Sequence, residues 1–203
     1  FADDGNYYVG SDGAAIMNSW KEIETEGRKF WAYFDNKGKI VRGGWKKISN
    51  IWYYFNDEGW MVTGWVDNNN YYLGTDGAMY VGWHKLLPPD PNSDADRPLS
   101  PGDRGLEDDK RWYYFATNGK KFVPNSSFGE KKIGDRKYAF DSSGAMVVGW
   151  VNVVDGTNDT ITDYRYYNSD GTIRTGWYSI QPPDALSSQY DDEVEWFYFN
   201  NQG

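Results

Sequence analysis

The 203-residue sequence contains no cysteine and only one histidine, His84. Without cysteine the chain can hold neither a disulfide framework nor a thiolate metal site. Ser/His/Asp catalysis would have to use His84, which we expect to be an exposed loop residue, and no Gly-x-Ser-x-Gly motif is present. The acidic residues that a glycosidase would need cluster in turns and loops, where burial is not expected to raise a carboxyl pKa. We therefore predict no catalytic residue and no enzyme activity in this chain.

Long apolar segments and an excess of basic residues are also missing. No run approaches the ~20 apolar residues that span a bilayer, and the mean hydropathy is −0.81. The 30 acidic and 21 basic residues give a net charge of −9, which argues against a nucleic-acid partner because phosphate binding depends on clustered Lys and Arg. No phosphate-binding glycine loop or nucleotide fingerprint occurs either. We expect no membrane insertion and no nucleic-acid binding.

Aromatic residues, by contrast, make up 19% of the chain and recur in order. Eight clusters each end four residues before a glycine, and a tryptophan, usually preceded by glycine, lies between clusters. The clusters end at Val9, Phe34, Phe55, Leu73, Phe115, Phe140, Tyr167 and Phe199, and the intervening tryptophans are Trp20, Trp45, Trp65, Trp83, Trp150 and Trp177. A period near 20 residues predicts an array of repeats, each of which buries its apolar face only against its neighbours.

The copy over residues 44–59 indicates how one repeat folds. Two short runs of aromatic and β-branched residues flank Ser49-Asn50, which predicts a β-hairpin, and the turn that follows ends at Gly59. An isolated hairpin is at best marginally stable, so each must stack on the next. We predict an all-β fold, a β-solenoid of tandem β-hairpin repeats of about 20 residues, elongated and without a helix longer than about one turn. Methionines two residues after the turn glycines, such as Met61, should pack beneath the next hairpin.

Residues 1–203 are predicted to form one array of about eight repeats, with insertions at 84–111, 151–163 and 178–195. Because the sequence opens and closes inside a repeat, we expect a fragment of a longer protein with adjoining domains. The two longer insertions begin with Pro-Pro-Asp and become acidic. The first carries Asp90, Asp94, Asp96, Asp103, Glu107, Asp108 and Asp109. These oxygens could bind calcium, although a solvated loop or a contact surface for a domain or polysaccharide is an open alternative.

Residues 44–65, GWKKISNIWYYFNDEGWMVTGW, resemble the cell-wall-binding repeat of choline-binding proteins from Gram-positive bacteria and their phages. Related repeats occur in the glucan-binding regions of glucosyltransferases and in the receptor-binding arrays of clostridial toxins. The resemblance implies a non-catalytic module, without a cofactor, that attaches a secreted or surface protein to the Gram-positive cell wall through choline-bearing teichoic acid. Binding of α-glucan or another polysaccharide, receptor binding and a purely structural spacer are the alternatives that the same resemblance leaves open.

In choline-binding relatives, ring faces from two consecutive repeats form an aromatic box around the quaternary ammonium group. The resemblance places the tryptophan between clusters, the first cluster residue, and a later tyrosine of the next repeat in each box. It implies three complete boxes, Trp20 with Trp31 and Tyr54, Trp45 with Trp52 and Tyr72, and Trp150 with Tyr164 and Tyr198, and two partial boxes, Trp83 with Trp112 and Trp177 with Trp196.

Other copies depart from this pattern. Asn70 and Lys137 occupy the middle position in two copies, and the third position beyond Trp112 falls on Ala139. In the sixth copy Phe128-Gly129 takes the place of Gly-Trp. We therefore predict no cation site near Trp65 or Phe128. Strand alternation places Trp52 and Tyr54 on one face of the hairpin and Tyr53 and Phe55 on the other, which suggests that Tyr53 is a core ring.

Overall fold

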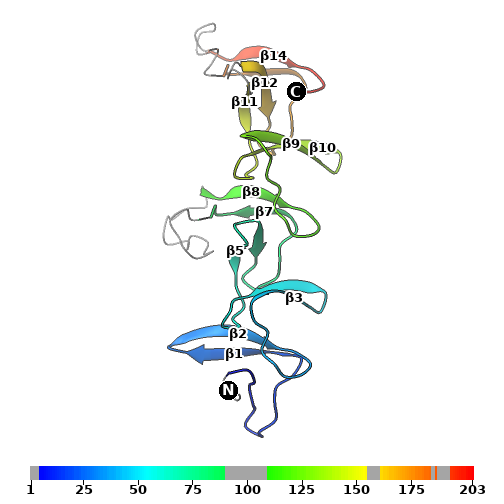
Figure 1. The fold of residues 1–203 in the computed structure, drawn as a ribbon. Helices are drawn as coiled ribbons and strands as arrows, with labels where there is room; N and C mark the ends of the chain where they lie inside the picture. Colours follow the sequence, from blue (N-terminus) through cyan, green and yellow to red (C-terminus); the bar gives the residue numbers. More distant parts are fainter. Residues whose placement is uncertain (1–4, 90–108, 155–160, 184–185, 187–192) are drawn as a thin grey trace. The chain divides into compact units, whose positions relative to one another are not determined.

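A computed structural model of the chain describes residues 5–89, 109–154, 161–183, 186 and 193–203 (Figure 1). These residues contain short strands and turns and no α-helix. Accordingly, no helix in this part of the chain has the length and apolar character to cross a membrane. The chain divides into two compact units, residues 1–110 with 115–121 and residues 111–114 with 122–203, which are described separately below.

The first unit consists of antiparallel hairpins. The strands are β1 (Ser19–Thr25), β2 (Arg28–Phe34), β3 (Gly44–Ile48), β4 (Ile51–Phe55), β5 (Gly64–Val66), β6 (Tyr71–Leu73) and β7 (Gly82–Leu86). Strand β1 pairs with β2, β3 with β4, and β5 with β6. Ser49 and Asn50 turn the chain between β3 and β4 with φ angles of 47° and 71°. Positive φ at both turn residues is the geometry of a tight hairpin, so the hairpin predicted at Ser49-Asn50 is confirmed.

The second unit repeats the same arrangement. Its strands are β9 (Phe128–Ile133), β10 (Arg136–Asp141), β11 (Gly149–Val154), β12 (Ile161–Tyr167), β13 (Gly176–Ile180) and β14 (Glu195–Phe199), while β8 (Arg111–Phe115) contributes residues to both units. Each antiparallel pair, β9–β10, β11–β12 and β13–β14, is again a two-stranded sheet.

One backbone hydrogen bond recurs between repeats and fixes which residues are equivalent. The amide two residues after a turn glycine donates to the carbonyl of the first cluster residue of an earlier repeat. The pairs are Met61 N to Trp31 O (2.7 Å), Met79 N to Trp52 O (2.9 Å) and Lys121 N to Asn70 O (2.7 Å) in the first unit, and Met146 N to Trp112 O (2.8 Å) and Ile173 N to Lys137 O (3.1 Å) in the second. Asn70 and Lys137 therefore stand at the position of Trp31 and Trp52, as the sequence predicted.

The core of each unit is a column of cluster-ending residues. Phe34, Phe55, Leu73 and Phe115 in the first unit, and Phe140 and Tyr167 in the second, are fully buried. Met61, Met79, Met146 and Ile173, each two residues after a turn glycine, pack beneath the next turn, as predicted. Met61 lies so close to Gly77, where φ is 78°, that a Cβ on this glycine would collide with the methionine sulfur. The close approach and the positive φ both require glycine there.

Candidate functional site: hollows walled by aromatic rings

The first unit contains a hollow of about 480 Å³ between consecutive hairpins, referred to below as the first hollow. It is lined by Trp20 from β1, Trp31 from β2, Tyr53 from β4, Met61, Thr75 and Asp76. The rings of Trp20 and Tyr53 lie 4.8 Å apart at 64° to each other. Trp31 is 45% exposed, so it forms an open wall, and the methionine forms the floor. The three rings leave space for an apolar or cationic group.

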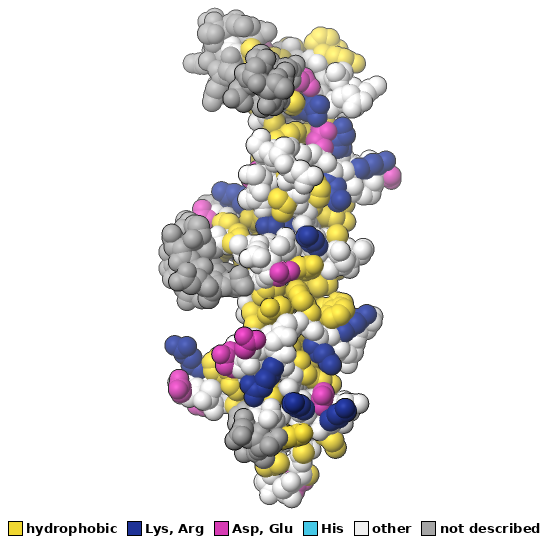
Figure 2. Space-filling model, viewed as in Figure 1, with side chains coloured by type: hydrophobic (Ala, Val, Ile, Leu, Met, Phe, Trp, Pro, Cys, Tyr) yellow, Lys and Arg dark blue, Asp and Glu magenta, His cyan; other side chains and the backbone are white. Residues whose placement is uncertain are grey.

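A second hollow of about 310 Å³ repeats this construction one hairpin further along the chain. It is lined by Trp45, Trp52, Tyr71, Met79 and Asn118. Trp45 and Tyr71 lie 4.9 Å apart at 65°, almost the geometry of the first hollow. On the face drawn in Figure 2, apolar side chains of the first unit gather at the level of β3 and β5. The first unit therefore presents two ring-walled sites in tandem.

The third wall of each hollow differs from the prediction by one residue. Tyr54 lies opposite Trp45 within its own hairpin, with ring centroids 5.2 Å apart, and Tyr72 lies opposite Trp65 at 5.1 Å. Directly opposite residues of an antiparallel pair share one face of the sheet, so these tyrosines pack on their own repeat. The predicted third walls Tyr54 and Tyr72 were wrong and are replaced by Tyr53 and Tyr71.

The core assignment of Tyr53 is corrected for the same reason. Its ring lines the first hollow, and the fully buried ring of that strand is Phe55. Burial and the nearby Asp76 carboxylate raise the pKa of the Tyr53 hydroxyl above its usual value. Both faces of β4 therefore serve a site, because Trp52 lines the second hollow and Tyr53 the first.

The second unit brings together the residues of the third predicted box. Trp150, Tyr164 and Tyr198 all line a hollow of about 300 Å³. Phe197, one residue before the predicted tyrosine, contacts Trp150 at 5.2 Å and 77°, as Tyr53 contacts Trp20 in the first unit. Tyr166 and Phe199 also lie against Trp150, at 5.3 Å and 5.4 Å. Tyr198 is 62% exposed and also faces Trp177 at 5.3 Å. The hollow has the predicted walls with Phe197 as an additional one.

The residues of the two predicted partial boxes differ in exposure. Trp83 is half-buried in β7, whereas Trp112 in β8 is exposed. The one-residue correction moves the third position beyond Trp112 from Ala139, which is fully buried, to Tyr138. Trp177 and Trp196, on paired strands β13 and β14, are 65% and 68% exposed. Trp177 packs against the ring of Tyr198, with centroids 5.3 Å apart, and Tyr198 is thus its neighbour on the paired strand.

The sixth copy replaces the aromatic box with ions. Gly129 pairs with Phe140 as Gly44 pairs with Phe55, so Glu130 stands where the other copies have tryptophan, and the predicted equivalence of Phe128-Gly129 with Gly-Trp was wrong by one residue. Glu130 forms salt bridges with Lys137 at 3.2 Å and Arg165 at 3.0 Å. By the register of β12, Arg165 takes the place of Tyr53.

A hydrogen bond from a tyrosine completes this ionic cluster. The Tyr167 hydroxyl donates to Glu130 Oε1 at 2.5 Å. Burial alone would raise the pKa of Glu130, but hydrogen bonds from Tyr167 and Lys137 and the charges of Arg165 and Lys137 hold it below its usual value. Burial and the same carboxylate raise the pKa of Tyr167. Arg165 also pairs with Asp163 at 3.3 Å. Two carboxylates therefore balance two cations where the other copies leave a hollow.

The copy at Trp65 carries a cation of its own. Trp65 is fully buried, and its Nε1 donates to the carbonyl oxygen of Leu87 at 3.0 Å. Lys121, which stands where Met61 and Met79 stand in the hollows, places its Nζ 4.7 Å from the Trp65 ring centroid. The absence of an external cation near Trp65 and Phe128 stays a prediction, and these side chains give it a second physical reason.

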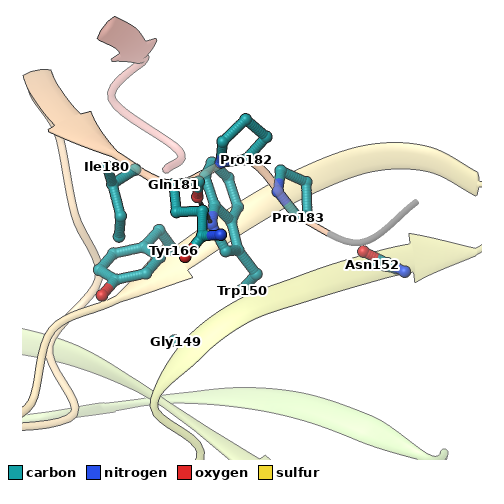
Figure 3. Close-up of a pocket in the computed structure, with 8 residues that line it drawn as sticks. All are labelled: Gly149, Trp150, Asn152, Tyr166, Ile180, Gln181, Pro182 and Pro183. Carbon is teal, nitrogen blue, oxygen red and sulfur yellow. Dashed lines mark hydrogen bonds between the residues drawn. The ribbon is translucent and has the colours of Figure 1, made fainter. Parts of the chain in front are cut away.

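A further pocket of about 600 Å³ was not found by sequence reasoning (Figure 3). Its walls are Gly149, Trp150, Asn152, Tyr166, Ile180, Gln181, Pro182 and Pro183. In Figure 3 Trp150 lies between Tyr166 and Ile180 on one side and Pro183 and Asn152 on the other. Trp150 Nε1 donates to Gln181 O at 2.8 Å, as Trp65 does to Leu87. Each accepting carbonyl belongs to the residue directly before a Pro-Pro pair. This shared Pro-Pro motif is the sequence feature that could have indicated the contact with tryptophan.

The calcium site considered for the first insertion falls almost entirely outside the described residues. Among the described residues no group of three or more His, Asp and Glu side chains could hold a metal. Of the seven acidic residues proposed as calcium ligands, all except Asp109 lie outside the described residues, as do residues 155–160, 184–185 and 187–192 of the other two insertions. His84 belongs to β7 and stacks on Tyr80 with centroids 3.9 Å apart, so its prediction as an exposed loop residue was wrong.

With this geometry established, the class of repeat follows from comparison with known families. Residues 41–83, which include the walls Trp45, Trp52 and Tyr71, match the choline-binding repeat, and residues 106–121 match the putative cell wall binding repeat. The resemblance to the choline-binding repeat family that the sequence indicated is confirmed. Glucosyltransferase-S of Streptococcus mutans is 25% identical over 207 residues, which cover 97% of this chain and 12% of that protein.

Solved structures share the fold. Choline binding protein F from Streptococcus pneumoniae, solved in the presence of a peptidoglycan analogue, is 26% identical with a TM-score of 0.63, over 97% of this chain and 54% of that one. CbpJ from the same species is 24% identical with a TM-score of 0.63, over 97% and 55% of the two chains. These likenesses confirm the predicted all-β, solenoid-type array of hairpin repeats. The chain spans about half the length of these structures.

Proposed function

We propose that this chain is a non-catalytic module that binds choline-type quaternary ammonium groups on a Gram-positive cell wall. The observation that carries the proposal is the pair of ring-walled hollows in the first unit, each with two tryptophans, one tyrosine and a methionine floor. A quaternary ammonium cannot donate a hydrogen bond, and ring faces of negative potential attract it without one. The match of the choline-binding repeat to residues 41–83 supports the same ligand.

Several weak sites would act together on a polymer. Each ring contributes roughly 0.5–2 kcal/mol, so a single hollow binds choline weakly. A wall polymer that bears many choline groups engages the hollows of both units at a high effective concentration. The partner would be choline-bearing teichoic acid, and the parent protein would be secreted and held at the cell surface, with any catalytic domain outside these residues.

The direct test is retention on choline-substituted resin. We expect the chain to bind the resin and to elute with free choline. A double variant, Trp31→Ala with Trp52→Ala, removes one exposed wall from each hollow of the first unit and should elute at a lower choline concentration. Passage of the wild-type chain through the resin without retention, while circular dichroism shows it folded, would refute the proposal.

A second candidate, binding of neutral polysaccharide such as α-glucan, is favoured by the pocket in Figure 3. Its walls combine two aromatic rings and two prolines with the amides of Asn152 and Gln181, and it has no charged side chain. Flat apolar faces suit sugar rings, and amides suit hydroxyl groups. The 25% identity to glucosyltransferase-S gives this candidate additional support. Titration with α-glucan oligosaccharides, followed by the fluorescence of Trp150 against a Trp150→Phe control, tests it.

A further inference from the structure

The two hollows of the first unit have nearly the same rings but different charges at the same positions. The turn that ends at Gly77 places Asp76 in the first hollow, and the turn that ends at Gly119 places Asn118 in the second. Each of these residues directly precedes the turn glycine that covers the methionine floor, Met61 in one case and Met79 in the other. The comparison is therefore between a carboxylate and an amide at one structural position.

Asp76 places a carboxyl side chain in the lining of the first hollow. No Lys or Arg among the described residues forms a salt bridge with it. Its effect already reaches a wall, because the Asp76 carboxylate, together with burial, raises the pKa of Tyr53. The negative charge that disfavours ionisation of Tyr53 would attract a cation bound in this hollow.

A second charge difference lies on the neighbouring strand, at the residue directly opposite Trp31 in the first hollow and opposite Trp52 in the second. It again makes the first hollow the more negative of the two. Glu22 lies opposite Trp31 in the β1–β2 pair, and Lys47 lies opposite Trp52 in the β3–β4 pair. Glu22 forms a salt bridge with Lys29 at 2.9 Å, which reduces the negative potential that Glu22 adds at the first hollow. Lys47 Nζ lies 6.0 Å from the Trp52 ring centroid, so a wall of the second hollow already faces an ammonium group of the protein.

We propose that the first hollow is the principal cation site of this unit, that Asp76 is the residue that selects for positive charge there, and that the second hollow binds by shape with little preference for charge. This inference rests on the proposed function. The expected difference follows from one attractive charge at the first hollow and one repulsive charge at the second. Choline should bind the first hollow about three- to tenfold more tightly at low salt, and the ratio should fall toward one near 1 M salt because of screening.

The turn itself allows a matched pair of variants. Asp76 Oδ1 accepts a hydrogen bond from Ala78 N at 3.0 Å, and Asn118 Oδ1 accepts one from Lys120 N at 3.1 Å. Both side chains thus make the same turn, so Asp76→Asn and Asn118→Asp each change charge while the hydrogen bond is kept. Because the protein already has Asp in one of these turns and Asn in the other, either residue is compatible with the turn.

The experiment follows the indole Nε1–H resonances of Trp20, Trp31, Trp45 and Trp52, assigned by Trp→Phe substitutions, during titration with choline chloride. The second probe is the neutral carbon isostere of choline, in which a tert-butyl group replaces the trimethylammonium group. Asp76→Asn should weaken choline binding at the first hollow about three- to tenfold and leave the isostere unaffected. Asn118→Asp should strengthen choline binding at the second hollow.

The outcomes separate this inference from the proposed function. If choline shifts none of the four indole resonances, the proposed function fails together with the inference. Equal binding of choline to both hollows would overturn the charge assignment while choline binding stands. The same conclusion would follow if Asp76→Asn weakened the binding of choline and of the isostere equally, or weakened the binding of neither. A loss specific to choline at the first hollow supports the inference.

Discussion

The open hollows of the first unit and the ionic cluster of the second occupy the same position on the same backbone. Met61 N donates to Trp31 O in one, and Ile173 N donates to Lys137 O in the other. Around the first bond lie Trp20, Trp31 and Tyr53, and around the second lie Glu130, Lys137 and Arg165. The register survives exchange of every wall residue. The backbone register therefore does not depend on the wall residues, whereas the buried cluster-ending residues are kept in both units.

Separating these two roles gives the largest expected effect. Phe55→Ala removes a fully buried ring and should cost ~3–5 kcal/mol of the free energy of unfolding. Trp52→Ala removes a larger ring, but one that is 40% exposed, and should cost ~1 kcal/mol or less. Urea denaturation followed by circular dichroism measures both. Equal losses would mean that the wall supports the fold as much as the core does.

The ionic cluster provides the next test. Glu130→Gln leaves Lys137 and Arg165 facing each other without the carboxylate that they share, and weakens the hydrogen bond from Tyr167. We expect a loss of ~1–3 kcal/mol. Glu22→Gln is the matched control, because the Glu22–Lys29 pair at 2.9 Å is largely exposed, and such pairs contribute ~0–1 kcal/mol. A loss for Glu130→Gln no greater than for the control would show that the cluster merely fills space.

A single wall of an open hollow should matter for binding rather than for stability. Trp31→Ala removes one of three rings in the first hollow. With roughly 0.5–2 kcal/mol per ring, choline should bind there about two- to thirtyfold more weakly. The second hollow does not contain Trp31, so the indole resonances of Trp45 and Trp52 should titrate as before. Parallel weakening of both hollows would indicate that the substitution disturbed the stacking of the hairpins.

The repeat pattern was sufficient to predict the hairpins, their turns and the middle wall of each site. Strand alternation predicts which residues share a face within one hairpin, so Trp52 and Tyr54 were grouped correctly. It does not predict the offset between consecutive hairpins, which depends on the backbone bond from Met61 N to Trp31 O. That offset determines that Tyr53, and not Tyr54, reaches the first hollow.

Contacts made by insertions and substitutions were harder to predict for a similar reason. Lys121 is separated from Trp65 by a long insertion, yet its ammonium lies over that ring. Only alignment of Lys121 with Met61 and Met79 by the turn glycine would have suggested it. The pocket beside Trp150 depends on a hydrogen bond to the backbone carbonyl of Gln181. Every residue has such a carbonyl, so the residue type at position 181 does not reveal the contact.

The smallest expected effect is the pH dependence of stability that the ionic cluster adds to the second unit. The folded-state pKa of Glu130 lies below its usual value of 4.5, so its stabilising contribution is complete above the unfolded pKa and is lost as pH falls through the folded one. The second unit should therefore lose stability between about pH 4.5 and the lower folded pKa. Thermal unfolding of wild type and Glu130→Gln at pH 6 and pH 3, with tryptophan fluorescence as the readout, measures this loss. The variant lacks the titrating group, so the difference between the two proteins should narrow at the lower pH. A constant difference between them would place the cluster's contribution in packing rather than in the charge of Glu130.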